Sequence, residues 1–202
     1  NLILRLYDSP PDQVFLDDRE IHTVPVEILR ENVGYVPQEG FLFSTTVAEN
    51  IAFGGDFSRE EIRQAARLAQ VEADVLEFPK GYDTVVGERG ITLSGGQRQR
   101  VAIARALIRQ PRLLLLDDCL SAVDTRTEAA ILQGLREARR GHTTIIVSHR
   151  LAAVRDADHI AVLDEGRLVE LGTHAELLAQ GGLYHDMYQR QLIEEKLAAE
   201  PD

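Results

Sequence analysis

The sequence predicts an α/β fold built around a mainly parallel sheet, and three observations support this expectation. The aliphatic run at residues 113–116 is typical of a strand that is buried on both faces, and residues 143–147 are expected to form a second buried strand. Segments with helical periodicity and N-cap residues separate these strands. A content of 44% hydrophobic and 27% charged residues is typical of a folded chain. Strands that alternate with helices favour a parallel sheet.

The charge balance and the single cysteine exclude several classes of protein. Acidic residues outnumber basic residues by 33 to 22, and the resulting net charge of −11 repels the phosphates of nucleic acids. We therefore expect no nucleic-acid partner. No apolar run approaches the ~18 residues that a membrane-spanning helix needs. Cys119 is the single cysteine, which excludes an intrachain disulfide and fits a reducing compartment.

In the first half of the chain, turn and cap residues set the expected elements. Two prolines in the loop 8–12 end a short apolar segment that reads as the last turns of a helix. Asp17 and Asp18 supply a polar hairpin turn, and Pro25 suits the first position of a helix. The expected elements are helical turns at 1–7, strands at 14–16, 19–21 and 33–36, and helices at 25–30, 58–70 and 71–78.

In the second half, helices and strands alternate more regularly. A capping box that begins at Ser94 starts a long helix, which Pro111 stops. A turn at residues 164–166 joins two apolar runs into a hairpin. The expected elements are helices at 94–109 and 125–140, a helix that starts at Thr173 and another at 182–199, strands at 113–116 and 143–147, and hairpin strands at 160–163 and 168–171.

Two acidic residues follow the run of four leucines. Asp117 and Asp118 stand beyond the carboxyl end of the predicted strand, where open α/β sheets bind ligands. A carboxylate at this place can hold a hard cation, commonly Mg²⁺, beside a nucleotide phosphate. The alternative is that both aspartates only cap the following turn, and the pair alone does not decide between the two.

The start of the long helix is a candidate anion site. Ser94, Gly95, Gly96 and Gln97 expose backbone N–H groups at a point where the helix dipole favours an anion. Glycine is needed there because a Cβ would keep a phosphate away from the backbone. The ordinary alternative is a capped helix start without a ligand.

Two further polar residues follow predicted strands. His149 comes just after the strand 143–147 and could contact a γ-phosphate or a nearby water. Gln38 follows the strand 33–36 and could ligate Mg²⁺ or hold a water. Taken singly, a turn histidine and an exposed loop glutamine are the more ordinary interpretations.

In their order and context, these motifs resemble the nucleotide-binding domain of an ABC transporter, over essentially all 202 residues. Residues 93–97 match the LSGGQ signature in full, and residues 36–38 look like the Q-loop. Residues 113–117 resemble the Walker B motif, residues 121–124 the D-loop, and His149 the switch histidine. The resemblance implies a P-loop NTPase-type fold with an inserted α-helical subdomain, and ATP and Mg²⁺ as cofactors.

The resemblance also implies a role for each candidate residue. Asp118 and His149 would be catalytic, and Asp117 and Gln38 would hold Mg²⁺. The residues that would bind the nucleotide are Gln38, Ser94, Gly95, Gly96, Gln97 and Asp124.

The resemblance further implies a domain organisation. Residues 1–202 would form one ABC ATPase domain without its Walker A segment. Within it, residues 38–110 would comprise the Q-loop, the helical subdomain and the signature, residues 111–180 the core with Walker B, D-loop and H-loop, and residues 181–202 a C-terminal helix. The phosphate-loop pattern G-x-x-x-x-G-K-[ST] does not occur among the 202 residues. We therefore expect these residues alone to bind ATP weakly.

Three segments are similar to exporters within this family, namely residues 41–51, 81–90 and 172–178. In such exporters a six-helix membrane domain usually precedes this domain on the same chain. The resemblance thus implies a transmembrane domain upstream of Asn1, a second exporter subunit as partner, and a position at the cytoplasmic face of the cell membrane. The transported substrate cannot be read from these segments.

Asp118 departs from the family pattern, which usually has glutamate at this position. The aspartate side chain is shorter by one C–C bond, ~1.5 Å, and a misplacement of about 1 Å can cost on the order of 10²-fold in rate. We expect a site that binds ATP and hydrolyses it slowly, as in the degenerate half of a heterodimeric exporter. Three alternatives stay open: a homodimeric exporter ATPase, a soluble ABC ATPase that is not linked to transport, and a regulatory module without turnover.

Overall fold

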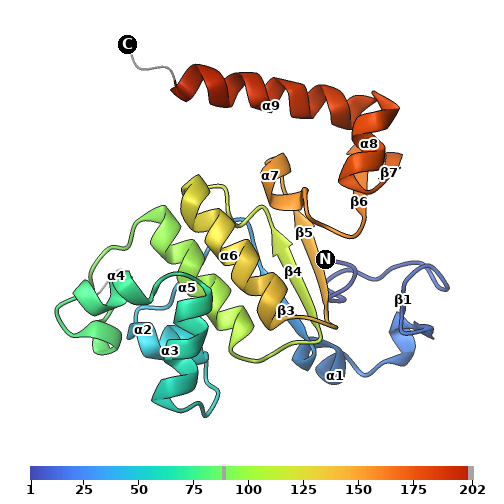
Figure 1. Ribbon diagram of the computed structural model, residues 1–202. Coiled ribbons are helices and arrows are strands. Elements are labelled where there is room, and N and C mark those ends of the chain that lie inside the picture. Colours follow the sequence, from blue (N-terminus) through green and yellow to red (C-terminus); the bar gives the residue numbers. More distant parts are fainter. Residues whose placement is uncertain (88–89, 200–202) are drawn as a thin grey trace. The chain divides into compact units, whose positions relative to one another are not determined.

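The computed structural model describes residues 1–87 and 90–199 and is shown in Figure 1. The chain divides into two compact units, Asn1–Val147 and Ser148–Asp202.

A three-stranded parallel sheet lies at the centre of the first unit, in the order β3-β4-β5. Its strands are β3 (Val33–Val36), β4 (Leu113–Asp117) and β5 (Thr143–Val147). Val36 pairs with Leu116, and Leu116 pairs with Ile146. Because the strands are parallel and in this register, their carboxyl ends meet at one edge of the sheet, as expected.

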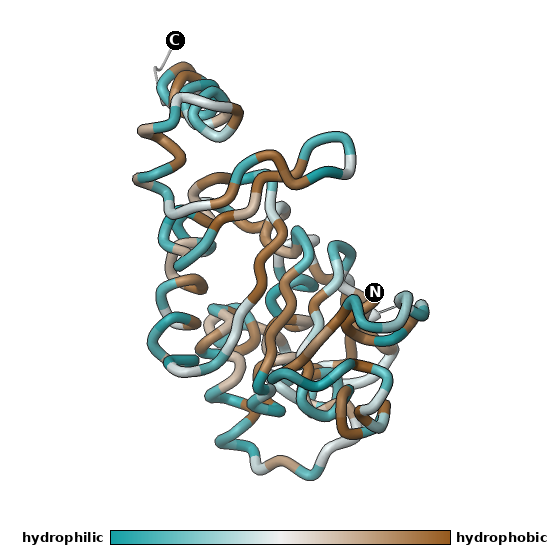
Figure 2. The backbone as a smooth tube through the Cα atoms, turned by 90° about the vertical axis from the view of Figure 1, so that its right-hand side faces the viewer, coloured by the Kyte–Doolittle hydropathy of each residue, from teal (hydrophilic) through white to brown (hydrophobic). Residues whose placement is uncertain are grey.

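The middle strand is buried, whereas β5 is not. Leu114 and Leu116 of β4 are 0% and 1% exposed, and the strands run as hydrophobic segments through the view in Figure 2. The expectation that β5 is a buried strand is wrong, since Ile145 and Val147 are 40% and 54% exposed. The reason is that Thr143, Ile145 and Val147 share one face of the strand, and the residue types of β5 do not reveal that this face has little cover.

The chain between β3 and β4 is mainly helical. It forms α2 (Val47–Ala52), α3 (Arg59–Leu68), α4 (Glu72–Glu77), a 3-10 turn at Gly81–Asp83, and α5 (Gly95–Leu107). The short helices α2, α3 and α4 gather at one end of the unit in Figure 1, and α5 contacts both α2 and α3 as well as β3. The buried residues Ile62, Ala65 and Ala66 form the apolar face of α3. The three predicted helices are confirmed in this region.

Helix α2 was not expected from the sequence. Thr46 and Glu49 form a reciprocal capping box at its start, in which the Thr46 hydroxyl accepts from the Glu49 N–H and the Glu49 carboxylate accepts from the Thr46 N–H. This T-x-x-E pattern is readable in the sequence and is the signal that could have identified the helix.

A small antiparallel hairpin precedes the sheet in the chain. Its strands are β1 (Phe15–Leu16) and β2 (Arg19–Glu20), joined by Asp17 and Asp18 at φ 47° and 62°. Positive φ at both central residues is the geometry of a tight hairpin turn, which Asp tolerates. Ile21 lies in the 3-10 turn Ile21–Thr23 rather than in the second strand, so the expected strand 19–21 is one residue too long.

The expected helical turns at residues 1–7 are wrong. Arg5 adopts φ 47° and donates from its side chain to the Val24 carbonyl at 2.8 Å, while Leu4 is buried. The segment forms turns, and the left-handed conformation of Arg5 is one that a right-handed α-helix does not contain. Helix α1 (Val26–Glu31) follows Pro25, which is the N-cap and not the first helical residue.

Helix α6 (Thr125–Ala138) connects β4 to β5. Asp124 is its N-cap, and Ile131, Leu132 and Leu135 are its buried apolar residues.

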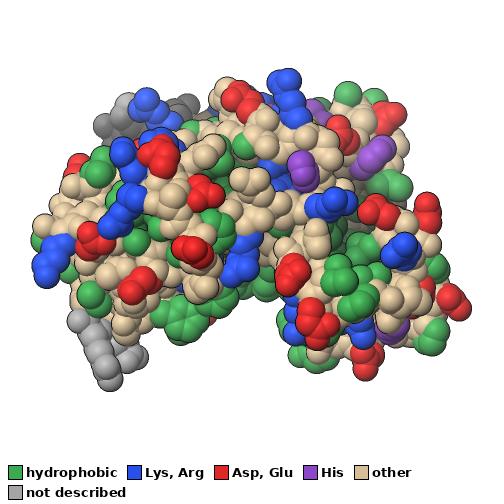
Figure 3. All heavy atoms as spheres, turned by 90° about the horizontal axis from the view of Figure 1, so that it is seen from below, with side chains coloured by type: hydrophobic (Ala, Val, Ile, Leu, Met, Phe, Trp, Pro, Cys, Tyr) green, Lys and Arg blue, Asp and Glu red, His purple; other side chains and the backbone are tan. Residues whose placement is uncertain are grey.

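On the face of the molecule that Figure 3 shows, acidic and basic side chains are interspersed.

The second unit contains α7 (Leu151–Val154), the antiparallel hairpin of β6 (Ile160–Asp164) and β7 (Arg167–Gly172), α8 (His174–Gln180) and α9 (Leu183–Ala199). Its core is a cluster of Leu151, Ile160, Val162, Leu177 and Tyr184. The predicted hairpin and the two predicted helices are confirmed, whereas α7 was not expected. Among the described residues, no helix combines the length and the apolar character required to cross a membrane.

Candidate functional site

Three candidate residues meet at the carboxyl edge of the parallel sheet. Gln38 follows β3 and donates from Nε2 to Oδ2 of Asp118 at 3.2 Å. The neighbouring Asp117, at the end of β4, accepts a hydrogen bond from the Tyr35 hydroxyl at 3.2 Å. Burial and the adjacent Asp117 carboxylate raise the pKa of Tyr35, so this phenol remains a donor at neutral pH.

Asp118 holds an unusual backbone conformation. Its φ is 44°, in the left-handed region that aspartate tolerates better than most residues. Its N–H donates to the Val147 carbonyl at 2.8 Å, and its own carbonyl accepts from the Ser121 hydroxyl at 3.0 Å. The backbone on both sides of the side chain is thereby fixed, and the carboxylate lies half-buried toward Gln38.

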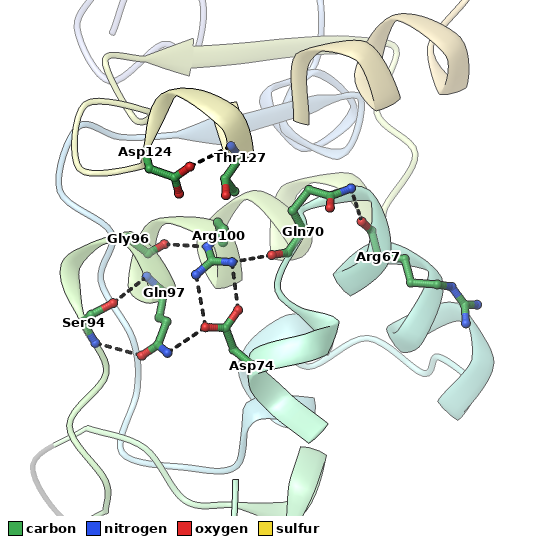
Figure 4. Close-up of polar contacts among 9 residues, drawn as sticks. All are labelled: Arg67, Gln70, Asp74, Ser94, Gly96, Gln97, Arg100, Asp124 and Thr127. Carbon is green, nitrogen blue, oxygen red and sulfur yellow. Dashed lines mark hydrogen bonds and ion pairs between the residues drawn. The ribbon is translucent and has the colours of Figure 1, made fainter. Parts of the chain in front are cut away.

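A capping box also holds the start of α5, as expected. Ser94 Oγ accepts from the Gln97 N–H at 3.2 Å, and Gln97 Oε1 accepts from the Ser94 N–H at 3.0 Å (Figure 4). Gly95 and Gly96 form the first turn of this 13-residue helix. Helix N-termini of this kind present backbone donors to an anion.

An acidic residue of α4 supports this helix start, and the sequence did not suggest it. Asp74 accepts from Gln97 Nε2 at 2.8 Å and forms an ion pair with Arg100 at 2.8 Å. Arg100 also donates to the carbonyls of Gly96 and Gln70, as Figure 4 shows. The helical region before the signature segment is thus tied to the first turns of α5.

The start of α5 faces the segment 121–124 across a cavity of ≈ 380 Å³. A Cβ added to Gly96 would lie 2.9 Å from the Ala122 carbonyl oxygen, so glycine is required for this close approach. Asp124 accepts from the Thr127 N–H at 3.0 Å, and this hydrogen bond lowers the pKa of its carboxyl group. The residues that line the cavity are Ser94, Gly95, Gly96, Arg100, Ala122, Val123 and Asp124.

The donor set at the sheet edge fits Mg²⁺ bound with few protein ligands. Asp117 and Gln38 offer oxygen atoms, which this hard cation prefers. Gln38 contacts Asp118 through its nitrogen, so this hydrogen bond does not use the amide oxygen that would ligate a metal. Among the described residues, no group of three or more His, Cys, Asp or Glu side chains is placed to hold a metal. Such a site suits Mg²⁺, which keeps several water or phosphate ligands.

His149 belongs to the second unit. Its side chain is exposed, and its backbone carbonyl accepts from Gln191 Nε2 at 2.6 Å. Gln191 also accepts from the Leu151 N–H at 3.0 Å, which ties the segment after β5 to α9.

Two phenylalanines of the segment 41–51 form an exposed aromatic cluster with Phe53. Phe41, Phe43 and Phe53 are 64%, 42% and 47% exposed. The Phe43 ring contacts both the Phe41 ring and the Phe53 ring. The Arg105 guanidinium lies 5.6 Å from the Phe43 ring centroid and donates to the Phe41 carbonyl. Asn50 is fully buried, and its Oδ1 accepts from the Phe43 N–H and from Arg105. Two polar side chains therefore hold three apolar rings at the surface. Of the segment 81–90, Glu88 and Arg89 lie outside the described residues.

The family model described as "ABC transporter" matches residues 1–121 of the chain. The chain belongs to the ABC transporter family. Residues 94–97, Asp117 and Gln38 lie within the matched range, and the fold is that of an ABC ATPase domain with a parallel sheet.

The similar proteins are longer than the chain. The chain is 49% identical over 192 residues to the "Probable multidrug resistance ABC transporter ATP-binding/permease protein YheI" of Bacillus subtilis, covering 95% of the chain and 33% of that protein. It is 47% identical over 203 residues to the human mitochondrial potassium channel ATP-binding subunit, covering 100% of the chain and 28% of that protein.

A solved structure of a bacterial Atm1-family ABC exporter with ATP bound matches with a TM-score of 0.89 and 46% identity, over 95% of this chain and 34% of that chain. The chain therefore resembles ATP-binding domains of the exporter type. It spans about a third of the length of these relatives.

Proposed function

We propose that this ABC protein is the ATP-binding and ATP-hydrolysing domain of an exporter. The carrying observation is the cluster of Gln38, Asp117 and Asp118 at the carboxyl edge of the sheet, in a chain that also has a glycine-rich start of α5. Because the chain spans about a third of its relatives, we infer that it acts with a transmembrane domain at the cytoplasmic face of a membrane.

Each residue has a distinct role in this proposal. Asp117 and the Gln38 amide oxygen hold Mg²⁺, which would supply charge neutralisation of the nucleotide phosphates when bound. Asp118 orients or deprotonates the attacking water, and His149 contacts the γ-phosphate or that water. The segment of Ser94, Gly95, Gly96 and Gln97, with Asp124, contacts ATP that the other subunit of a pair holds. Two composite ATP sites result.

We further propose that the site containing Asp118 is the slow site of a heterodimer. The support is the short aspartate side chain, whose carboxylate accepts a hydrogen bond from Gln38. Its left-handed backbone conformation favours aspartate over glutamate. A homodimer with two such sites would be slow at both.

The test uses the transporter purified with its natural partner and placed in lipid nanodiscs. After free ATP is removed rapidly, we expect one ATP retained for each pair of subunits, and intact-mass measurement should find two different subunits. Retention of no ATP, or one kind of subunit with ordinary turnover at both sites, would contradict the heterodimer. Absence of ATP-dependent transport into inside-out vesicles for any exported compound would contradict the exporter role.

A further inference from the structure

Gln99 is a buried polar residue that connects two loops of the candidate site. It lies on α5, and only 6% of its surface is exposed. Its Nε2 donates to the Gln38 carbonyl at 3.1 Å, and its Oε1 accepts from the Ala122 N–H at 3.2 Å. Both ends of one amide group are therefore hydrogen-bonded to the backbone of two separate segments.

The two loops lie close against α5 on either side of this amide. A Cβ added to Gly40 would lie 3.1 Å from the Arg98 carbonyl, and one added to Gly96 would lie 2.9 Å from the Ala122 carbonyl. Backbone therefore packs on backbone at both places, and neither loop can move far without displacing the Gln99 side chain.

The chemistry of the bridge selects glutamine. One loop offers a carbonyl, which needs a donor, and the other offers an N–H, which needs an acceptor. A primary amide carries one of each at the end of a chain of this length. An ionised glutamate lacks the donor, and methionine of similar length lacks both. Loss of the bridge would remove the hydrogen bond at each of the two loops.

We propose that Gln99 is a positioning residue that couples the loop of Gln38 to the loop of Ala122. The Gln38 side chain contacts Asp118, and Ala122 lines the cavity at Ser94 and Gly96. A shift of the Gln38 backbone is thus passed through the Gln99 amide to the wall of that cavity. This inference rests on the function proposed above, in which the two places serve different ATP sites of the pair.

The experiment compares Gln99→Met and Gln99→Glu with the wild type in the assembled transporter. The matched control is Gln133→Met on α6, at an exposed glutamine whose Nε2 donates across one helical turn to Glu137. Hydrogen exchange is measured on peptides that cover residues 36–41 and 118–124, together with kcat and KM for ATP.

For Gln99→Met we expect faster exchange in both peptides and a fall in kcat of about tenfold or more, because small displacements of reacting groups are costly. The KM for ATP should change little, and Gln133→Met should change none of these quantities. For Gln99→Glu, protonation restores a donor and an acceptor, and a buried carboxyl group has a raised pKa. The ratio of its kcat to that of the wild type should therefore rise as the pH falls, and that of Gln99→Met should not.

Faster exchange in only one of the two peptides would contradict the proposal that Gln99 connects both loops. Faster exchange in both with unchanged kcat would show that Gln99 is an anchor without a coupling role, and so would equal losses in kcat, ATP affinity and thermal stability. If the wild-type assembly itself has no ATPase activity, the proposed function fails. The exchange measurement then still decides whether the bridge joins both loops.

Discussion

Gln38 and Asp118, 80 positions apart in the chain, are joined by a hydrogen bond of 3.2 Å at the end of two neighbouring strands. The contact exists because β3 and β4 are paired in parallel and in register, so that the residues after each strand emerge side by side. The Gln38 amide and the Asp118 carboxylate therefore lie next to each other at the carboxyl edge of the sheet. The roles of both residues can be separated by substitution.

Asp118→Asn should reduce the steady-state ATPase of the assembled transporter only modestly. Asparagine tolerates the left-handed φ of 44° and can still accept from Gln38, so the fold is preserved. Removing the corresponding carboxylate of the partner subunit should instead cost the roughly 10²–10⁴-fold expected of a lost general base. Equal losses from both changes would contradict the assignment of the slow site to this chain.

Gly95→Ala and Gly96→Ala should differ in their effect on folding. A Cβ at Gly95 would meet the Ala122 Cβ at 3.5 Å and Arg98 Nη2 at 3.9 Å, both ordinary contacts, whereas one at Gly96 would lie 2.9 Å from the Ala122 carbonyl oxygen. Gly95→Ala should therefore leave the midpoint of thermal unfolding unchanged and still abolish turnover at the partner's ATP site. Gly96→Ala should lower both the midpoint of thermal unfolding and the turnover at the partner's ATP site. Wild-type ATPase in a folded Gly95→Ala protein would argue against a phosphate contact there.

Asp74→Asn should lower the free energy of unfolding of the protein by about 1.5–3 kcal/mol, in the range of hydrogen bonds to charged groups. Its carboxylate serves both Gln97 and Arg100, and the two side chains of the ion pair are 24% and 15% exposed. Asp83→Asn is the matched control, since the Arg59–Asp83 pair is 51% and 65% exposed. Its effect should stay below about 1 kcal/mol. Urea titrations of both variants measure the difference, and equal values would contradict it.

Glu49→Gln should destabilise the protein at pH 7 more than at pH 3. The Thr45 hydroxyl, followed by the Thr46 N–H, lowers the pKa of Glu49 below its usual 4.5. The charged group thus contributes stability above the unfolded pKa, and this contribution is lost as the pH falls through the lower folded value. Unfolding by urea at both pH values tests the sign. In a Thr46→Ala background the pH dependence of the Glu49→Gln effect should shrink.

Cys119 should not react with maleimide in the folded protein. Burial raises the pKa of its thiol to about 12, and only 1% of the residue is exposed. The reactive thiolate is therefore scarce at pH 7, and reagents cannot reach the sulfur. Because Cys119 is the single cysteine, mass spectrometry should find complete labelling in urea and very slow labelling without it. Rapid labelling of the native chain would mean that the end of β4 opens readily.

The elements that the sequence predicted well are those with strong local signals. Four leucines identified β4, and the box at Ser94 and Gln97 identified the start of α5. Residues 1–7 were misassigned because an apolar cluster alone cannot separate a short helix from packed turns. The burial of β5 depends on what covers its faces, which its own five residues do not encode.

The positions of candidate residues were predictable where these residues follow a strand or begin a helix, as for Asp117, Asp118 and Ser94. This was not the case for Tyr35, Asp74 and Gln99, whose partners lie 82, 23 and 61 positions away. Their residue types are common on helices and strands, and only the folded chain reveals what they touch. Supporting residues of this kind carry no local pattern.

The parallel pairing of β3 with β4 also has a kinetic consequence. All of α2, α3, α4 and α5 lies between the two strands in the chain, so the sheet can close only after this whole segment has been brought together. Closing this loop costs conformational entropy before any contact between the two strands can offset it, whereas each helix forms through contacts between residues that are close in the sequence. We therefore expect the helices to form ahead of the sheet during folding, and Gln38 to meet Asp118 only in the final stage.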